Sequence, residues 1–290
     1  MQDYIIITDS TVDLPRDLTT KLSVEVVPLK FTVDGEERYD YPYTENMDIK
    51  EFYNNLRNGK TSSTSQVNPN EFVDIFTKYL EDGKDILYIA FSSGLSGTFA
   101  SAKIASEELR DKYPERNIKI VDSLCASMGE GLIVYLASEM KKEGKTIFEI
   151  ENWLNNNKLS VCHWFTVDDL NHLKRGGRIS SIGAFLGNML HIKPILHVDN
   201  SGLLKLVTKV RGRQRCLNFL ADKMGELGID IKSQTVFISH GDCLEDAENL
   251  KGIIEKRFGV KDVRLNTIGT VIGSHAGPGT VALFFIGKER

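Results

Sequence analysis

The chain has 290 residues, of which 41% are hydrophobic and 26% are charged, and its formal net charge is -4. This composition is ordinary for a globular protein of one large or two average domains. A mildly acidic chain is not built to wrap nucleic acid, so we expect no nucleic-acid partner. No uninterrupted apolar run in the sequence reaches the ~20 residues that a membrane span needs, so we expect no integral membrane segment.

The N-terminal sequence and the cysteines indicate the cellular compartment and which cofactors to expect. A short apolar strand is predicted at residues 4–8 with no basic leader before it, which predicts a soluble, cytoplasmic protein without a signal peptide. Four cysteines lie far apart and form no C-x-x-C pair, so we expect reduced thiols and neither a metal site nor a redox cofactor.

The first half of the chain alternates strands and helices. Strands are predicted at 4–8, 24–29, 85–91 and 118–122, and helices from about 15, over 48–57, from about 70, from about 98 and over roughly 124–156. The run 60–66 contains five consecutive hydroxyl side chains, which compete for backbone hydrogen bonds and favour a loop. The alternation predicts a doubly wound parallel sheet, Rossmann-like, with helices on both faces.

The second half predicts a different topology. A strand passes into a short helix that Gly176-Gly177 ends, and residues 182–190 are predicted to form an apolar helix. Strands at 192–198 and 203–207, joined by Asp199-Asn200-Ser201-Gly202, are typical of a hairpin. A helix at 213–227, a unit of strand 235–239, helix 244–258 and strand 263–267, and a last strand at 282–286 complete the chain. We predict a mixed-sheet α/β domain, with the domain boundary near residue 160.

The segment from Ser92 to Thr98 is a candidate anion site. A glycine-containing turn between a buried strand and a helix presents backbone N–H groups at the positive end of the helix dipole. Ligands of open α/β sheets bind beyond the carboxyl ends of the strands, where this turn lies. Neither a phosphate-binding loop nor a dinucleotide fingerprint is present, so tight nucleotide binding is disfavoured. Helix capping alone explains the segment about equally well.

Two other segments carry candidate polar groups. The hydroxyls of 61–65 are placed to face the same crevice, although a solvated loop is the more common explanation of such a run. Four glycines surround His275 within residues 268–280, which allows close backbone approach and a histidine that donates to a carboxylate. The alternative is a tight turn with a structurally satisfied histidine.

Basic residues cluster in two segments of this acidic chain, Lys174-Arg175-Gly176-Gly177-Arg178 and 205–215. Such clustering fits a docking surface for an acidic partner or a phosphate, and a solvated charged face is the common alternative.

Six segments together resemble one family. They occur in the order seen in DegV proteins, and the resemblance covers essentially the whole chain. One departure is Val67, where the family usually has proline. The segments are Asp9-Ser10-Thr11, Thr64-Ser65-Gln66, Ser92-Ser93-Gly94-Leu95-Ser96-Gly97-Thr98, Leu173-Lys174-Arg175-Gly176-Gly177-Arg178-Ile179, Ile192-Lys193-Pro194-Ile195 and Gly273-Ser274-His275-Ala276-Gly277-Pro278-Gly279.

The resemblance implies a DegV/dihydroxyacetone-kinase-like architecture and a fatty-acid-binding subunit of a bacterial fatty acid kinase. Residues 1–160 would carry the carboxylate-binding loops, and residues 161–290 would close an acyl tunnel. The carboxylate of a fatty acid such as palmitate, stearate or oleate would be held by Thr64, Ser96 and His275, with Ser93 as the other candidate serine and with contributions from Ser65 and Gly97.

The same resemblance implies a role in phospholipid metabolism without catalysis by this chain. A separate ATP-dependent kinase subunit of the dihydroxyacetone-kinase type would phosphorylate the carboxylate, because this chain has no ATP site of its own. Arg175 and Arg211 match positions that the resemblance links to kinase docking.

Two other functions are compatible with parts of the sequence. Ser96 and His275, with Asp168, Asp169 or Asp242 between them, follow the Ser–Asp–His order of a hydrolase, although Thr98 stands where G-x-S-x-G needs glycine. A dihydroxyacetone-kinase-like substrate subunit would instead bond His275 covalently to a small ketone.

Overall fold

A computed structural model describes residues 3–40, 48–179 and 192–290 of the chain, and the helix predicted at 182–190 lies outside this part. The strands are β1 (Tyr4–Asp9), β2 (Val24–Val27), β3 (Lys30–Val33), β4 (Glu36–Tyr39), β5 (Ser62–Ser65), β6 (Asp85–Ala90), β7 (Ile118–Asp122), β8 (Val161–Thr166), β9 (Ile192–Val198), β10 (Leu204–Arg211), β11 (Thr235–His240), β12 (Asp262–Thr267) and β13 (Val281–Ile286). The α-helices are α1 (Arg16–Leu22), α2 (Ile49–Arg57), α3 (Pro69–Glu81), α4 (Thr98–Lys112), α5 (Met128–Lys142), α6 (Ile147–Asn157), α7 (Leu170–Arg175), α8 (Arg213–Leu227), α9 (Leu244–Phe258) and α10 (Thr270–Ala276), and single 3₁₀ turns are η1 (Ser10–Val12), η2 (Lys158–Ser160) and η3 (Ile231–Ser233).

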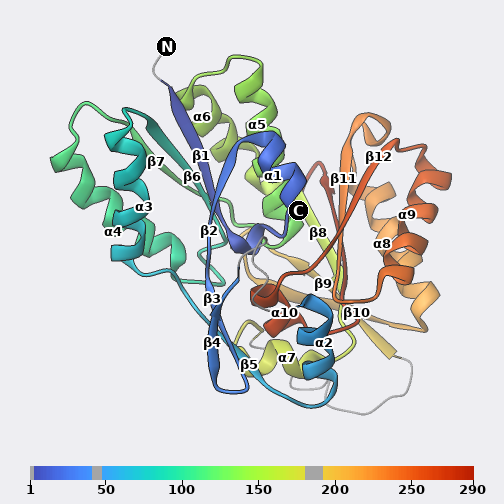
Figure 1. The fold of residues 1–290 in the computed structure, drawn as a ribbon. Helices are drawn as coiled ribbons and strands as arrows, with labels where there is room; N and C mark the ends of the chain where they lie inside the picture. The colour runs from blue at the N-terminus through green and yellow to red at the C-terminus, as the bar shows by residue number, and fades with distance from the viewer. Residues whose placement is uncertain (1–2, 41–47, 180–191) are drawn as a thin grey trace.

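The first half forms the predicted parallel sheet, in the order β2-β1-β6-β7. Alternate side chains of its strands point to opposite faces. Ile7, Ile86 and Tyr88 pack with α3 and α4, whereas Ile6 and Leu87 pack with α1, α5 and α6. Helices therefore cover both faces, which confirms the doubly wound arrangement (Figure 1).

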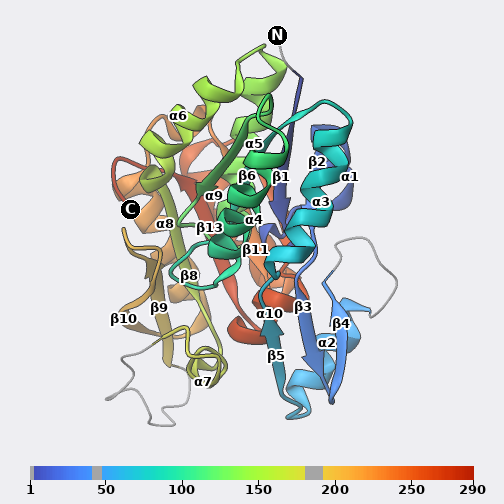
Figure 2. The same ribbon diagram turned by 90° about the vertical axis from the view of Figure 1, so that its left-hand side faces the viewer.

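The second half forms the predicted mixed sheet, in the order β10-β9-β8-β13-β11-β12. β9 and β10 are the predicted antiparallel hairpin, although β10 continues to Arg211, and β11 and β12 are parallel. On one face Trp164 and Phe285 pack with α8 and α9; on the other, Phe165 and Phe284 pack with α5. Helix α5 thus lies between the two sheets and contacts strands of both (Figures 1 and 2).

A third, small sheet corrects one prediction. The run 60–66 is not simply a loop, because residues Ser62–Ser65 form β5 and pair antiparallel with β3, which also pairs with β4. Thr64 lies opposite Phe31, and the hydroxyl of Ser62 donates to the carbonyl of Thr32 at 2.8 Å. The ladder from β3, a strand that we did not predict, satisfies the backbone groups for which the hydroxyls were expected to compete.

The glycine-rich segment around His275 also differs from the tight turn that was one interpretation of it. Residues Thr270–Ala276 form helix α10, which contacts β3 and β5 of the small sheet and also α7. Although α10 lies in the second half of the chain, it packs against strands of the first half (Figure 1). A boundary at residue 160 stays a prediction; the strands of the parallel sheet precede it and those of the mixed sheet follow it.

Within residues 3–40, 48–179 and 192–290, every helix is too short or too polar to cross a membrane.

Candidate functional site

A cavity of about 210 Å³ lies on the α5 side of the mixed sheet and is lined by residues from both halves of the chain. Its volume exceeds the ~150 Å³ of an engineered apolar cavity that stays dry and binds benzene. Most of the lining is apolar, which suits a hydrocarbon ligand. The apolar lining consists of Leu29, Phe91, Leu95, Ala126, Phe165, Leu173, Val198, Leu204, Ile268, Val271, Ile272, Ala276, Ala282 and Phe284.

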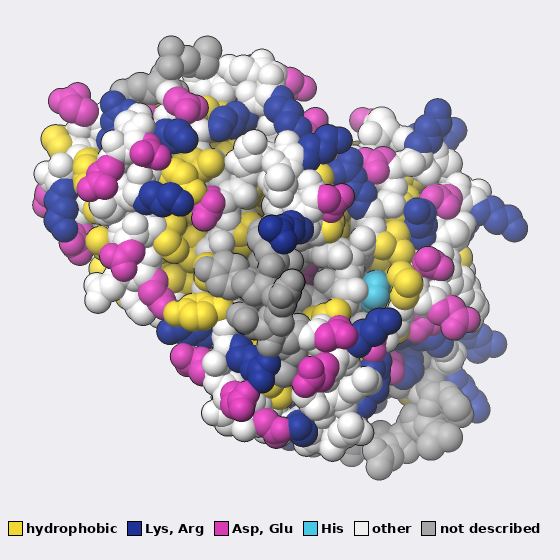
Figure 3. Space-filling model, viewed as in Figure 1, with side chains coloured by type: hydrophobic (Ala, Val, Ile, Leu, Met, Phe, Trp, Pro, Cys, Tyr) yellow, Lys and Arg dark blue, Asp and Glu magenta, His cyan; other side chains and the backbone are white. Residues whose placement is uncertain are grey.

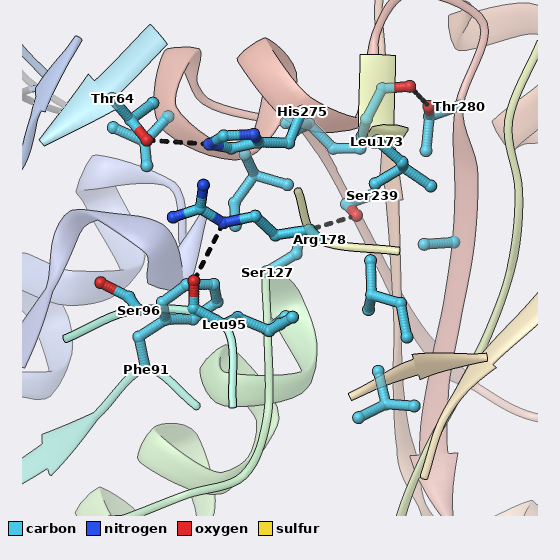
Figure 4. A pocket seen from close by; sticks show the side chains of 18 of the residues that line it. Thr64, Phe91, Leu95, Ser96, Ser127, Leu173, Arg178, Ser239, His275 and Thr280 are labelled. Carbon is cyan, nitrogen blue, oxygen red and sulfur yellow. Dashed lines mark hydrogen bonds between the residues drawn. The ribbon is translucent and has the colours of Figure 1, made fainter. Parts of the chain in front are cut away.

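A hydrogen bond between β5 and α10 marks the polar part of the lining. The Thr64 hydroxyl lies 2.8 Å from Nε2 of His275, although the two residues are 211 positions apart (Figure 4). The other ring nitrogen, Nδ1, is buried and has no hydrogen-bond partner in the described part of the chain. It lies so close to Gly176 that a Cβ there would approach Nδ1 to 2.0 Å, so Gly176 must be glycine for His275 to sit here.

Burial and a nearby cation keep His275 neutral. Loss of solvent around the imidazole, followed by the positive charge of Arg178, lowers the pKa of His275 to about 4. The Arg178 guanidinium also lines the cavity, and its Nε–H donates to the carbonyl of Leu95 at 3.0 Å (Figure 4). The imidazole is neutral, so Arg178 supplies the positive charge of this pair. A guanidinium in a fixed position favours the binding of an anion.

Ser96 and Gly97 reach the cavity from the turn before α4. The Ser96 hydroxyl is 2.9 Å from that of Thr98 and accepts the Thr98 N–H at 3.2 Å. A Cβ on Gly97 would come within 2.0 Å of Oε1 of Gln66, so the glycine allows the amide of Gln66 to pack against this turn. Ser65 and Gln66 also line the cavity.

Ser93, the other candidate serine, lies elsewhere. Its side chain is exposed, its N–H donates to Oδ1 of Asp122 at 3.2 Å, and it is outside the cavity lining. Of the two serines in this turn, the structure therefore directs Ser96 to the cavity.

Two buried carboxyl groups from the first half position α10 and hence His275. Oδ1 of Asp13 accepts the N–H of Gly269 at 2.8 Å, and Oδ1 of Asp40 accepts the hydroxyl of Thr270 at 2.8 Å and its N–H at 3.3 Å. Acceptors at the first turn satisfy N–H groups that have no partner within the helix. Burial raises the pKa of Asp13 well above its usual range.

A second, polar hollow of about 420 Å³ adjoins the cavity and shares Thr64, Arg178 and His275 with it. Arg175 and His172 also line this hollow, and Arg175 Nη2 is 3.0 Å from Nδ1 of His172. The side chains of Arg175 and Arg211, the predicted docking residues, are exposed. On the face seen in Figure 3, cationic and anionic side chains are interspersed, which differs from the single-signed field of a nucleic-acid-binding surface.

Neither a hydrolase triad nor a metal site is formed by the described residues. Ser96 pairs with Thr98 and His275 with Thr64, and Nδ1 of His275 has no carboxylate to orient it, whereas a triad needs a serine–histidine–acid chain. Residues 3–40, 48–179 and 192–290 contain no group of three or more His, Cys, Asp or Glu side chains that could hold a metal ion.

The family model for the uncharacterised proteins of the DegV family matches residues 4–288. The chain belongs to the DegV family. A DegV domain-containing protein of Clostridium perfringens is 47% identical over 100% of this chain and 99% of its own length. Another, from Lactococcus lactis, is 37% identical over 99% and 98% of the two chains.

Solved structures of DegV proteins share this fold. A DegV lipid-binding protein of Thermotoga maritima is 31% identical, covers 99% of both chains and superposes with a TM-score of 0.87. A DegV family protein of Thermus thermophilus, described for its fatty acid binding, is 29% identical over 98% of this chain and 99% of its own, with a TM-score of 0.87. DegV of Bacillus subtilis, a fatty acid binding protein, is 28% identical over 99% and 100%, with a TM-score of 0.83.

Sequence reasoning missed several lining residues of this DegV protein. Arg178 was part of a basic segment and of a recognised motif but received no role in the cavity, and its position between Gly177 and the apolar Ile179 was the signal for an inward-facing side chain. Gln66 was part of a recognised motif but received no role. Ser127 and Ser239 were not singled out, and a lone serine in an apolar segment carries no signal that would have found them.

Proposed function

We propose that this DegV protein binds one long-chain fatty acid, with the acyl chain in the apolar cavity and the carboxylate at Thr64, Ser96 and His275. One observation carries the proposal: a buried, neutral imidazole, two hydroxyls and a guanidinium line the same apolar cavity. The fatty acid binding described for the related Thermus and Bacillus proteins supports the same ligand class.

The energetics favour such a ligand. A carboxylate that leaves water must be hydrogen-bonded, or it becomes protonated. The hydroxyls of Thr64 and Ser96, a neutral His275 and the charge of Arg178 supply donors, and backbone N–H groups near Ser65 and Gly97 would add to them. Each buried methylene contributes roughly 0.8 kcal/mol, so a tail of ~16 carbons supports tight binding after the costs of association.

The bound carboxylate would then be presented to a separate, ATP-dependent kinase subunit of the dihydroxyacetone-kinase type. The polar hollow beside His275 provides room for a phosphoryl donor to approach the carboxylate, and exposed Arg175 and Arg211 are the proposed docking residues. Positioning the carboxylate oxygen is the contribution of this chain. Use of ATP places the reaction in the cytoplasm.

The binding proposal is tested by native mass spectrometry of the protein as purified and after delipidation. A stoichiometric mass increment that matches a fatty acid, restored when palmitate or oleate is added, is the expected result. A bare protein mass that stays bare at excess fatty acid would overturn the proposal.

The kinase proposal needs a separate assay. Delipidated protein is loaded with palmitate and incubated with ATP and a purified kinase subunit, and acyl phosphate is trapped with hydroxylamine. Product that depends on both proteins is expected. Binding of palmitate without any acyl phosphate would leave the lipid site intact and remove the role in phosphorylation.

A further inference from the structure

Two serine hydroxyls lie in the wall of the cavity at a different place from the Thr64–His275 pair (Figure 4). Ser127 precedes α5 and is 5% exposed; Ser239 lies on β11 and is fully buried. Their Oγ atoms are 2.9 Å apart. Ser239 is two residues after Phe237, so both side chains point to the α5 side of the mixed sheet, where the acyl chain is proposed to lie.

The hydrogen bonds of this pair run to a buried acid. Oδ2 of Asp13 is 2.5 Å from Oγ of Ser127, and Oδ1 accepts the N–H of Gly269. When Asp13 is ionised, Ser127 donates to it and Ser239 donates to Ser127, which leaves both lone pairs of Ser239 unused. When Asp13 is protonated, it donates to Ser127 and Ser127 donates to Ser239. The Ser239 O–H is then an unused donor. In both states Ser239 has spare hydrogen-bonding capacity at the cavity wall.

Other polar side chains of the wall are committed to the protein. Nδ1 of His163 lies 2.9 Å from the carbonyl of Val161, and its Nε2 accepts the N–H of Ala126 at 3.3 Å. The hydroxyl of Thr280 donates to backbone carbonyls within 3.0 Å, so it can only accept from a ligand, whereas Ser239 can also donate when Asp13 is protonated. Ser239 is therefore the group of this wall best placed to bind a polar substituent of a ligand.

We propose that the cavity prefers a long-chain fatty acid that carries a hydroxyl group on its acyl chain, and that Ser239 Oγ is the partner of that hydroxyl. This inference rests on the proposed fatty acid function. A hydroxyl both donates and accepts, so it matches Ser239 in either direction of the hydrogen-bond chain, whereas a keto oxygen matches only one. In an entirely apolar wall a buried hydroxyl would lose its hydrogen bonds to water without replacement.

The test compares stearic acid with a series of monohydroxystearic acids that differ in the position of the hydroxyl. Dissociation constants are measured on the delipidated full chain by displacement of a fluorescent fatty acid. We expect at least one positional isomer to bind about tenfold more tightly than stearic acid. Ser239→Ala is expected to abolish most of that ratio. The control Ser138→Ala removes a buried α5 hydroxyl, bonded to the carbonyl of Val134 and outside the cavity lining, and should retain the ratio.

Several results would overturn the inference. Wild-type protein that binds every hydroxystearic acid no better than stearic acid excludes the preference, and this result does not depend on any variant folding. A ratio that survives Ser239→Ala excludes the assigned partner. If Ser239→Ala does not fold, the analogue of the preferred isomer with a methyl group in place of the hydroxyl, which can neither donate nor accept, must lose the preference. Absence of binding by every ligand in the series would instead refute the proposed function itself.

Discussion

The two polar places in the cavity wall differ in the charge and the polar groups that they present. At Thr64 and His275, a hydroxyl and a neutral imidazole line the cavity and the Arg178 guanidinium lies nearby. At Ser127 and Ser239, a chain of hydrogen bonds ends on Asp13, and the spare capacity is confined to one hydroxyl. The first place is therefore suited to a charged group of the ligand. The second contributes to the stability of the protein and to discrimination between acyl chains with and without a hydroxyl group.

The largest expected effect on ligand affinity comes from removing the imidazole of His275. His275→Ala deletes a hydrogen bond to a charged ligand group, so palmitate should bind roughly 100-fold more weakly. The thermal midpoint should show that the variant is folded. His197→Ala, which removes a histidine stacked on Trp164 and outside the cavity lining, is the control. Equal affinities of His275→Ala and wild type would exclude His275 from the site.

Removing the Asp13 carboxyl group, which is hydrogen-bonded to Ser127, should mainly lower the stability of the protein. Asp13→Ala leaves the Gly269 N–H and the Ser127 hydroxyl without their acceptor, so the free energy of unfolding should fall by about 2 kcal/mol in urea titrations. Asp17→Ala, at an exposed carboxylate on α1, should change it by no more than about 0.5 kcal/mol. A stability equal to that of wild type would show that the Asp13 contacts contribute nothing.

The lowered pKa of His275 predicts a pH dependence of the ligand-free protein. Because the folded-state pKa, about 4, lies below the unfolded value, the unfolded chain binds a proton first as the pH falls. Relative to His275→Gln, wild type should therefore lose roughly 1.4 kcal/mol of unfolding free energy between pH 7.5 and pH 5.5. A difference between the two proteins that stays constant over this range would contradict the buried, neutral imidazole.

The smallest effect on ligand affinity is expected for removal of the Arg178 guanidinium beside His275. Arg178→Gln removes a half-buried positive charge, so fatty acid affinity should fall about fivefold, and the loss should shrink at high salt. Arg257→Gln makes the same change of net charge at an exposed site on α9 and serves as the matched control. Affinities that fall equally in both variants would indicate a long-range effect of net charge.

Much of the fold followed from local patterns. The apolar runs of β1 and β6, the hairpin turn before β10 and the helices from α8 to α9 were predicted close to their observed positions, because period and turn chemistry are properties of neighbouring residues. Residues Ser62–Ser65 were misjudged because their strand exists only through the backbone of β3, some 30 positions earlier.

The site divided in the same way. The sequence by itself determined the alternating α/β architecture, and its motifs placed Thr64, Ser96 and His275 among the candidates. Tertiary structure decided that Thr64 and His275 meet across 211 positions, that Ser96 and not Ser93 faces the cavity, and that Arg178 lies beside the imidazole. The physical reason is that burial, and with it the pKa of His275 and the spare capacity of Ser239, depends on everything packed around a side chain, whereas period and capping depend only on near neighbours.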